Sequence, residues 1–454
     1  MFTTLTAPSA LNPKARWLAR IRQLSVLAMA AFTFACAETP EFGNPGFVSG
    51  FSGAVVADEP AAALAGRDVL SSGGTAGDAA AAVFFVLSVT KPAAAGLMTS
   101  GLCVAADTQR GEARAFRFSA PAGVRAMAAL HARFGSLPWR QVVSPAEKLA
   151  RFGFNLSKSF VNDWQAAAPG GQAARAIFGS QIAVGQKSQN LALAALLGRI
   201  RENGAGAFHN GPFANQMIAD IRAAGHAVDR ESWRRAIPET ADANLLEIGN
   251  HKIAVAPFAG SAGARQTALW PLIEDSFSEG LPGASARAGA IAPRAAIHET
   301  GFVAADSLGG AVACSISMGR PYGTGRLASG MFLADRASPS TGPLLIFNEP
   351  TKSLLAAAAG AGAPGWPLAI AAAAVDDDEP LPAQIRNPRA VSTGAGGFLA
   401  EPGSTLLSNN AQKIEKIGRV NAIVCRLGLP NYAETCVASA DPRGQGFAAI
   451  DSVQ

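Results

Sequence analysis

Apolar positions along the chain follow the spacing of helices in some segments and that of strands in others. Residues 61–70 are rich in Ala and Leu, and residues 78–88 are apolar on every face, so we expect a pair of helices of which the second is buried. In residues 311–318 the even positions are large and the odd positions small, which predicts a strand with one packed face and one closely approached face. This mixture of helices and strands without a repeat is typical of an α/β or α+β layered domain.

Further segments extend this pattern. Helices are expected over 123–153 and, as two amphipathic helices, over 189–224; strands are expected over 102–106, 113–118, 343–347, 420–427 and 434–439. Residues 256–294 are poor in pattern and rich in Ala, Gly and Pro, which predicts a loop. Residues 354–374 are Ala-rich but contain several glycines and prolines, which favours a loop and a buried helix over a membrane span.

The amino terminus has the pattern of an export signal. A basic segment without acidic residues is followed by an apolar run at 24–35, about half the length that a membrane-spanning helix needs. Cys36 comes next, and a cysteine at this position resembles the lipidated cysteine of bacterial lipoproteins. We therefore expect residues 1–36 to direct export, with the protein either periplasmic or anchored to a membrane only through lipid on Cys36. The alternative is an amphipathic or disordered tail.

Composition narrows the classes of function. Of 454 residues, 49% are hydrophobic and only 16% are charged, so the chain can bury a core and is not globally disordered. The net charge of +5 is spread without a dense basic block, and nucleic acid is not an expected partner. The five cysteines form no CxxC motif and the five histidines no HExxH motif, so we expect no metal site.

The other cysteines and one acidic run leave alternatives open. Cys425 and Cys436 flank a turn signal at 428–431, so they either bridge across a hairpin or remain buried thiols. Cys103 and Cys314 lie in apolar runs and are expected to be core residues. The acidic run 376–379 is interpreted as a solvated loop, with a calcium site as the minor alternative.

Five stretches, in order across residues 55–450, resemble the γ-glutamyltransferase (γ-glutamyltranspeptidase) family. They are Leu70–Ala80 between two helices, Phe134–Phe154 with its Ser144-Pro145-Ala146-Glu147 core, Glu202–Ile221, Tyr322–Gly325 and Ala440–Arg443. The resemblance implies an α+β fold of the N-terminal-nucleophile hydrolase type, a four-layer αββα sandwich of two stacked antiparallel sheets flanked by helices. It also implies a single domain over 50–454, with a large-subunit-like part at 50–298 and a small-subunit-like part at 299–454.

The resemblance further implies a reaction without a cofactor. In the family a precursor cuts itself, and the new amino-terminal Thr attacks a γ-glutamyl amide with its hydroxyl while its own amine acts as base. Backbone N–H groups stabilise the oxyanion. The expected ligands are therefore glutathione and related small γ-glutamyl compounds or peptides, and the sequence does not fix the oligomeric state.

Three substrate-binding positions carry over from the family motifs. Arg117, in the segment 115–121, matches the arginine that holds the glutamyl α-carboxylate; the alternative is a surface arginine on a strand. Asp335 is the nearby acid available for the substrate amine. Gly365 lies at the oxyanion position, but Trp366 replaces the second glycine. The spacing of residues 360–365 also matches GxGxxG, although Pro364 argues against a dinucleotide site.

The nucleophile position departs from the family. Alignment on Asp306 places Glu299 at the catalytic Thr and Thr300 at the residue that follows it. A carboxylate has no Oγ for self-cleavage, and in a strand Thr300 faces the opposite side from residue 299. We favour a catalytically silent, uncut relative that binds or assembles, with Arg117 holding a γ-glutamyl or peptide ligand. The alternatives are a divergent transferase or hydrolase that uses Thr300 as its catalytic residue after self-cleavage, and an acylase of the same fold.

Overall fold

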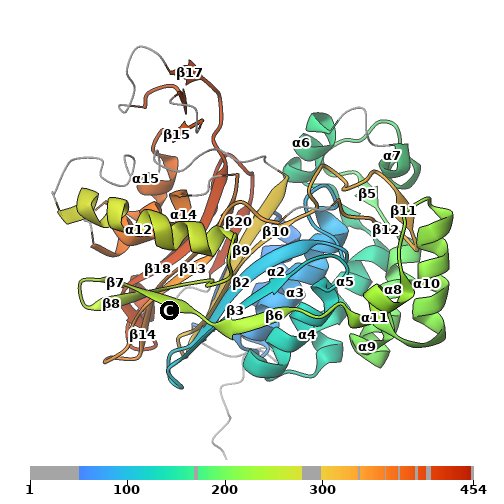
Figure 1. The fold of residues 1–454 in the computed structure, drawn as a ribbon, viewed down its shortest axis with the longest axis horizontal. Helices are drawn as coiled ribbons and strands as arrows, with labels where there is room; N and C mark the ends of the chain where they lie inside the picture. The colour runs from blue at the N-terminus through green and yellow to red at the C-terminus, as the bar shows by residue number, and fades with distance from the viewer. Residues whose placement is uncertain are drawn as a thin grey trace, which may run out of the picture. The chain divides into compact units, whose positions relative to one another are not determined.

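Two antiparallel β-sheets lie face to face in the computed structural model of this chain (Figure 1). The structure describes residues 51–167, 172–278, 298–335, 338–362, 365–376, 379–393, 397–404 and 411–450. The segment 1–36, with Cys36 and the predicted export signal, lies outside these residues. The unit that begins at Gly46 contains everything described below.

The first sheet has the strand order β20-β1-β9-β10-β2-β3-β6. Its strands are β1 (Gly53–Ala57), β2 (Ser100–Asp107), β3 (Glu112–Phe118), β6 (Glu239–Asp242), β9 (Glu299–Asp306), β10 (Gly310–Ser317) and β20 (Phe447–Ile450). The second sheet has the order β19-β18-β14-β13-β8-β7. Its strands are β7 (Asn244–Ile248), β8 (His251–Val255), β13 (Leu344–Asn348), β14 (Ser353–Ala361), β18 (Arg419–Leu429) and β19 (Cys436–Ser439).

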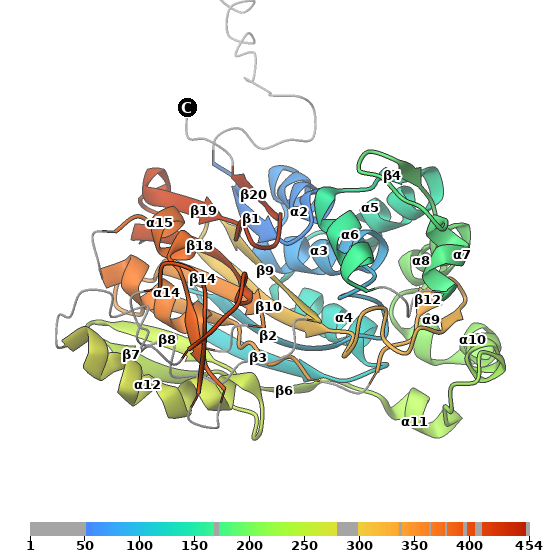
Figure 2. The ribbon, with the colours of Figure 1, turned by 90° about the horizontal axis from the view of Figure 1, so that it is seen from above.

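Helices cover the outer face of each sheet (Figures 1 and 2). On the side of the first sheet these are α2 (Pro60–Ser71), α3 (Ala76–Thr90), α4 (Gly123–Phe134), α5 (Trp139–Phe152), α6 (Lys158–Ala166), α7 (Gln172–Phe178), α8 (Leu191–Asn203), α9 (Gly206–His209), α10 (Gly211–Ala223) and α11 (Arg230–Arg235). On the side of the second sheet they are α12 (Ala262–Ser278), α14 (Trp366–Asp376) and α15 (Leu381–Arg386). Short strands complete the described chain: β4 (Phe154–Asn155), β5 (Lys187–Ser188), β11 (Leu327–Ala328), β12 (Met331–Phe332), β15 (Ala390–Ser392), β16 (Phe398–Ala400) and β17 (Gln412–Lys413).

Side-chain alternation along the strands builds three apolar layers. In β9, Phe302 and Ala304 pack towards the helices of the first sheet, whereas Val303 and Ala305 pack between the sheets. A third layer lies between the second sheet and α14. The expected four-layer αββα sandwich is therefore confirmed.

The motif that opens the family resemblance has a structural role at the start of α3. Thr75 caps the helix, and its side chain and that of Asp78 each accept a hydrogen bond from the other's backbone N–H. Asp78 also accepts from the backbone N–H groups of Ser136 and Leu137, which precede α5. This carboxylate therefore joins α3 to the turn between α4 and α5.

Two expectations about Ala-rich segments are wrong. A loop is expected over residues 256–294, but residues 262–278 form α12, which continues through Pro271 because Trp270 and Ile273 bury against the second sheet. Residues 279–294 of that range lie outside the described residues. Residues 354–374 contain the expected buried helix, α14, but their first part is the strand β14 and not a loop. Small side chains suit β14 because it lies between two neighbouring strands and is buried on both faces.

Both cysteine pairs form disulfides across neighbouring strands. Cys425 and Cys436 face each other between β18 and β19, so the bridging alternative holds. Cys103 and Cys314 are buried as expected, but they are not free thiols, since they are bonded between β2 and β10. Within the part of the chain that the structure describes, no helix could cross a membrane.

The two sheets approach each other closely at a pair of glycines, Gly301 and Gly360, which gives a first prediction. A Cβ at Gly301 in β9 would lie 2.4 Å from the backbone nitrogen of Gly360 in β14. We expect Gly301→Ala to lower the free energy of unfolding by about 1–3 kcal/mol, because the sheets must separate to admit the methyl group. Urea unfolding followed by circular dichroism measures this change. Gly206→Ala is the control, since its Cβ meets no atom within 4 Å, and an equal loss in both variants would contradict the prediction.

Candidate functional site

Glu299 begins β9 and its carboxylate is held by the other half of the sandwich. It is 3% exposed and accepts hydrogen bonds from the Ser340 N–H at 3.0 Å, the Ser340 hydroxyl and the Thr341 N–H at 3.2 Å. Burial raises the pKa of Glu299, although these donors act in the opposite direction. The side chain that the sequence aligns with the family's nucleophile is therefore a carboxyl group held in place by hydrogen bonds, without a hydroxyl of its own.

Thr300 points away from this carboxylate into a separate polar network. Its hydroxyl donates to Asp58 Oδ2 at 2.9 Å, and the residue is fully buried. Asp58 also accepts from Asn421 Nδ2 at 2.9 Å and pairs with Arg419 at 3.2 Å. The opposite facing of positions 299 and 300, expected from the strand period, is confirmed.

Arg419 and Asn421 connect this network to the start of β9. Arg419 Nη2 donates to the backbone carbonyl of Glu299 at 2.6 Å, and Asn421 Nδ2 donates to that of Gly301 at 2.8 Å. Both residues lie on β18 in the second sheet. Neither residue is predicted from the sequence, although polar residues at the start of an otherwise apolar strand are a signal there.

The three substrate-binding positions expected from the family motifs lie on three different segments of the fold. Arg117, on β3, pairs with Glu239 at 2.5 Å and lies over the ring of Phe258 at 5.0 Å. Asp335 pairs with Arg320 at 2.7 Å on the surface.

Gly365 is buried at the start of α14, where its carbonyl accepts from Ala369. None of Arg117, Asp335 and Gly365 lines the pocket of about 640 Å³ beside position 299. The substrate roles of these three residues, and the catalytic role of Thr300, remain predictions.

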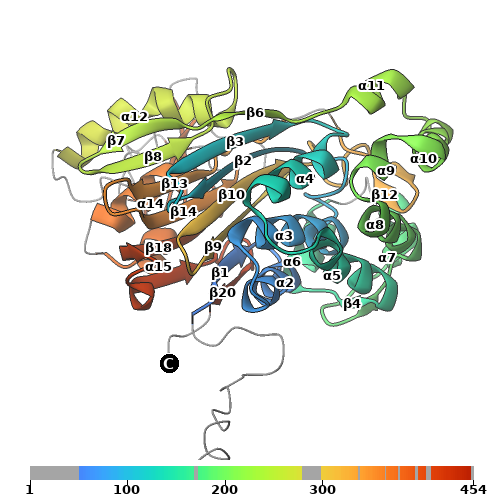
Figure 3. The ribbon, with the colours of Figure 1, turned by 90° about the horizontal axis from the view of Figure 1, so that it is seen from below.

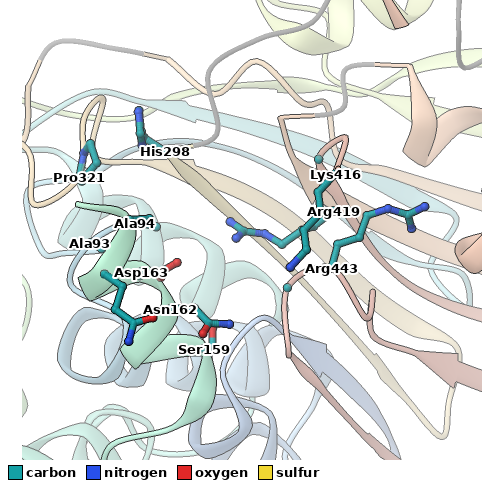
Figure 4. Close-up of a pocket in the computed structure, with 14 residues that line it drawn as sticks. Ala93, Ala94, Ser159, Asn162, Asp163, His298, Pro321, Lys416, Arg419 and Arg443 are labelled. Atoms are coloured by element: carbon teal, nitrogen blue, oxygen red, sulfur yellow. The ribbon is translucent and has the colours of Figure 1, made fainter. Parts of the chain in front are cut away.

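That pocket opens between α6 and the segment that leads into β18 (Figure 4). One wall carries Asn162, Asp163 and Ser159 from α6, and the opposite wall carries Lys416, Arg419 and Arg443; His298, Pro321 and Ala93 are among the other lining residues. Arg419 thus contacts both the pocket and the backbone of Glu299. Among the described residues no group of His, Cys, Asp or Glu is placed to hold a metal ion.

A buried carboxyl near the pocket gives a prediction on pH. Burial raises the pKa of Glu59 from its ordinary value of 4.5 to about 7, and the hydrogen bond from Ser157 and the charge of Lys91 offset this only in part. Between these two pH values the folded chain keeps a proton that the unfolded chain releases. The contribution of Glu59 to the free energy of unfolding is therefore fully present below pH 4.5 and is lost as the pH rises to about 7.

We expect Glu59→Gln to remove this dependence. The variant should be more stable than the parent at pH 8, by on the order of 3 kcal/mol, and little different at pH 4.5. Urea unfolding at a series of pH values measures the difference. A constant difference between the two proteins across this range would contradict the raised pKa.

Structural neighbours define the class of fold. The cephalosporin acylase from Bacillus halodurans matches with a TM-score of 0.73 and 17% identity, covering 91% of this chain and 98% of the acylase. A structure named LmbA2991HD matches with a TM-score of 0.66 and 15% identity, covering 90% of this chain and all of its own. At these identities the likeness concerns the fold alone, which is that of the N-terminal-nucleophile hydrolases.

Sequence comparisons then give the family. The model of the gamma-glutamyltranspeptidase family matches residues 62–126 and 118–288, half of the chain, and this protein belongs to that family. A glutathione hydrolase of Aspergillus flavus is 26% identical over 261 residues, which are 50% of this chain and 44% of that protein. Glutathione hydrolase 3 of Arabidopsis thaliana is 28% identical over 261 residues, 50% of this chain and 41% of its own. The matched region therefore spans less than half the length of these curated relatives.

Proposed function

We propose that this chain is a gamma-glutamyltranspeptidase-family protein that does not cut itself before position 299. In this proposal it turns over γ-glutamyl amides weakly or not at all and acts as a binding or assembly protein. The observation that carries the proposal is the Glu299 carboxylate, buried and bonded to Ser340 and Thr341.

The chemistry of the nucleophile supports this proposal. Self-cleavage and acyl transfer both need a hydroxyl or thiol at the new amino terminus, and a carboxylate cannot supply one. Loss of the nucleophile from an enzyme that depends on it costs on the order of a million-fold in turnover. Thr300, the hydroxyl residue that follows Glu299 in the chain, is buried and donates to Asp58, which disfavours a role as nucleophile in the folded, uncut chain.

The alternative function is hydrolysis of glutathione or a related γ-glutamyl amide, as the names of the relatives suggest. It requires a cut between Glu299 and Thr300, followed by movement of Thr300 out of its network. Such a cut would also convert the Glu299 carbonyl, which accepts from Arg419, into a terminal carboxylate.

Purification and intact mass measurement test the proposal directly. We expect one polypeptide, and no release of p-nitroaniline from γ-glutamyl-p-nitroanilide above the rate of a Thr300→Ala control. The control variant removes only the Thr300 hydroxyl, so equal rates are the expected result. Two fragments with Thr300 at a new amino terminus, together with release that Thr300→Ala abolishes, would establish the alternative.

We also propose that the protein is exported, as residues 1–36 predict. The two disulfides support this proposal, because such bonds persist mainly in oxidising compartments.

A further inference from the structure

The pocket beside position 299 has two walls of different chemistry (Figure 4). On α6, Ser159, Asn162 and Asp163 share one helix face, because residues three and four apart lie on the same side. Across the cavity lie the cationic side chains of Lys416, Arg419 and Arg443. A volume of about 640 Å³ is in the range of small-ligand sites.

Most charges around the pocket already have partners. Arg443 donates to Glu401 and to Asp441, and also to backbone carbonyls. Asp163 accepts from the buried Lys91 at 2.7 Å. These groups form fixed walls and have little capacity for a further ligand.

Four polar side chains that line the pocket have no hydrogen-bond or ion-pair partner among the described residues: Asn162, Gln165, His298 and Lys416. Lys416 is an exposed ammonium group beside Arg419, whose Nη1 also has no partner in the described chain. Asn162 and Gln165 are amides on one helix face, each with both a donor and an acceptor. Burial lowers the pKa of His298, so its imidazole is neutral near pH 7.

We propose that this pocket binds a short peptide by its terminal carboxylate, which lies between Lys416 and Arg419, with the amides of Asn162 and Gln165 on the peptide backbone. A carboxylate suits an ammonium beside a guanidinium, because both donate charge-assisted hydrogen bonds. A side-chain amide complements the N–H and C=O of a peptide group. No γ-glutamyl group is required, and Arg117 takes no part.

The inference rests on the proposed binding role and gives that role a location. Arg419 links the pocket to position 299, since the same guanidinium lines the pocket and donates to the carbonyl of Glu299. The two proposals fail separately: intact mass reports the cut at position 299, and ligand titration reports the pocket.

The test is calorimetric titration of the full chain with acetyl-Ala-Ala-Ala and with its carboxamide, acetyl-Ala-Ala-Ala-NH2. We expect saturable binding of the acid and about ten-fold weaker binding of the carboxamide, since one charge-assisted contact is worth about 1.5 kcal/mol. Lys416→Gln should weaken binding of the acid by a similar factor. Lys187→Gln, at an exposed lysine on β5 outside the pocket, is the matched control and should leave binding unchanged.

A second pair of measurements isolates the amide contacts. The double variant Asn162→Ala and Gln165→Ala should weaken binding of the tripeptide several-fold and leave binding of acetate unchanged. Absence of saturation at millimolar tripeptide, equal affinities of the acid and the carboxamide, or equal effects of the two lysine variants would overturn the proposed site. An unchanged tripeptide affinity in the double variant would overturn the assignment to peptides.

Discussion

Replacing Asp441 with alanine is expected to lower the free energy of unfolding by about 3–5 kcal/mol. Asp441 and Arg389 form an ion pair at 2.6 Å in which neither side chain is exposed. The carboxylate also accepts from the backbone N–H groups of Val420 at 2.9 Å and Arg443 at 2.9 Å. Truncation of Asp441 would leave the Arg389 guanidinium buried without its counter-charge. An uncompensated buried charge strongly destabilises the folded state.

Chemical denaturation followed by circular dichroism measures this loss. Asp242→Ala is the matched control, because Asp242 pairs with Arg114 at 2.8 Å but its side chain is 86% exposed, so its loss should cost less than about 1 kcal/mol. Asp441→Asn keeps the shape and tests the charge alone. Similar losses for Asp441→Ala and Asp242→Ala would show that burial of the pair does not control its contribution.

Removal of the Cys103–Cys314 disulfide between β2 and β10 should lower the free energy of unfolding by an amount comparable to that of Asp441→Ala. Cys103 and Cys314 are separated by 211 residues in sequence, and the bond between them restricts the unfolded chain over that whole loop. On the chain-entropy model the double variant Cys103→Ala and Cys314→Ala loses roughly 5 kcal/mol. The same model gives roughly 3 kcal/mol for Cys425 and Cys436, which are 11 residues apart.

Denaturant titrations of both double variants under oxidising conditions give the comparison. The parent protein treated with a reducing agent should approach the less stable variants. An unchanged unfolding midpoint in the Cys103→Ala and Cys314→Ala variant would contradict this prediction. So would a thiol titration that finds these cysteines free in the unreduced, denatured parent.

The pattern of apolar residues predicted those helices and strands that are determined by residues nearby in the sequence. The helix α3 was predictable because its residues are apolar on every face and a turn precedes it. The strand β14 was not, since its Ala and Gly residues suit a strand only once β13 and β18 lie on either side. In α12, Pro271 argued for a loop, but the burial of Trp270 beside it outweighs the missing hydrogen bond.

At the candidate site, the sequence predicted in which directions two neighbouring side chains point, and not which residues they contact. Alignment on Asp306 identified Glu299 and Thr300, and the period of a strand gave their opposite directions. Nothing near them in sequence indicates that Ser340 and Arg419 are their neighbours, because the two sheets bring these residues together only in the folded chain.

The strand order also governs when the protein can fold during synthesis. Among the described strands, β1 pairs only with β9 and β20, which both come late in the chain (Figure 3). When β1 leaves the ribosome, its nearer partner is still about 250 residues from being made. Its backbone must stay unpaired for that interval, a period in which chaperones or a secretion machinery that accepts unfolded chains can capture the nascent protein.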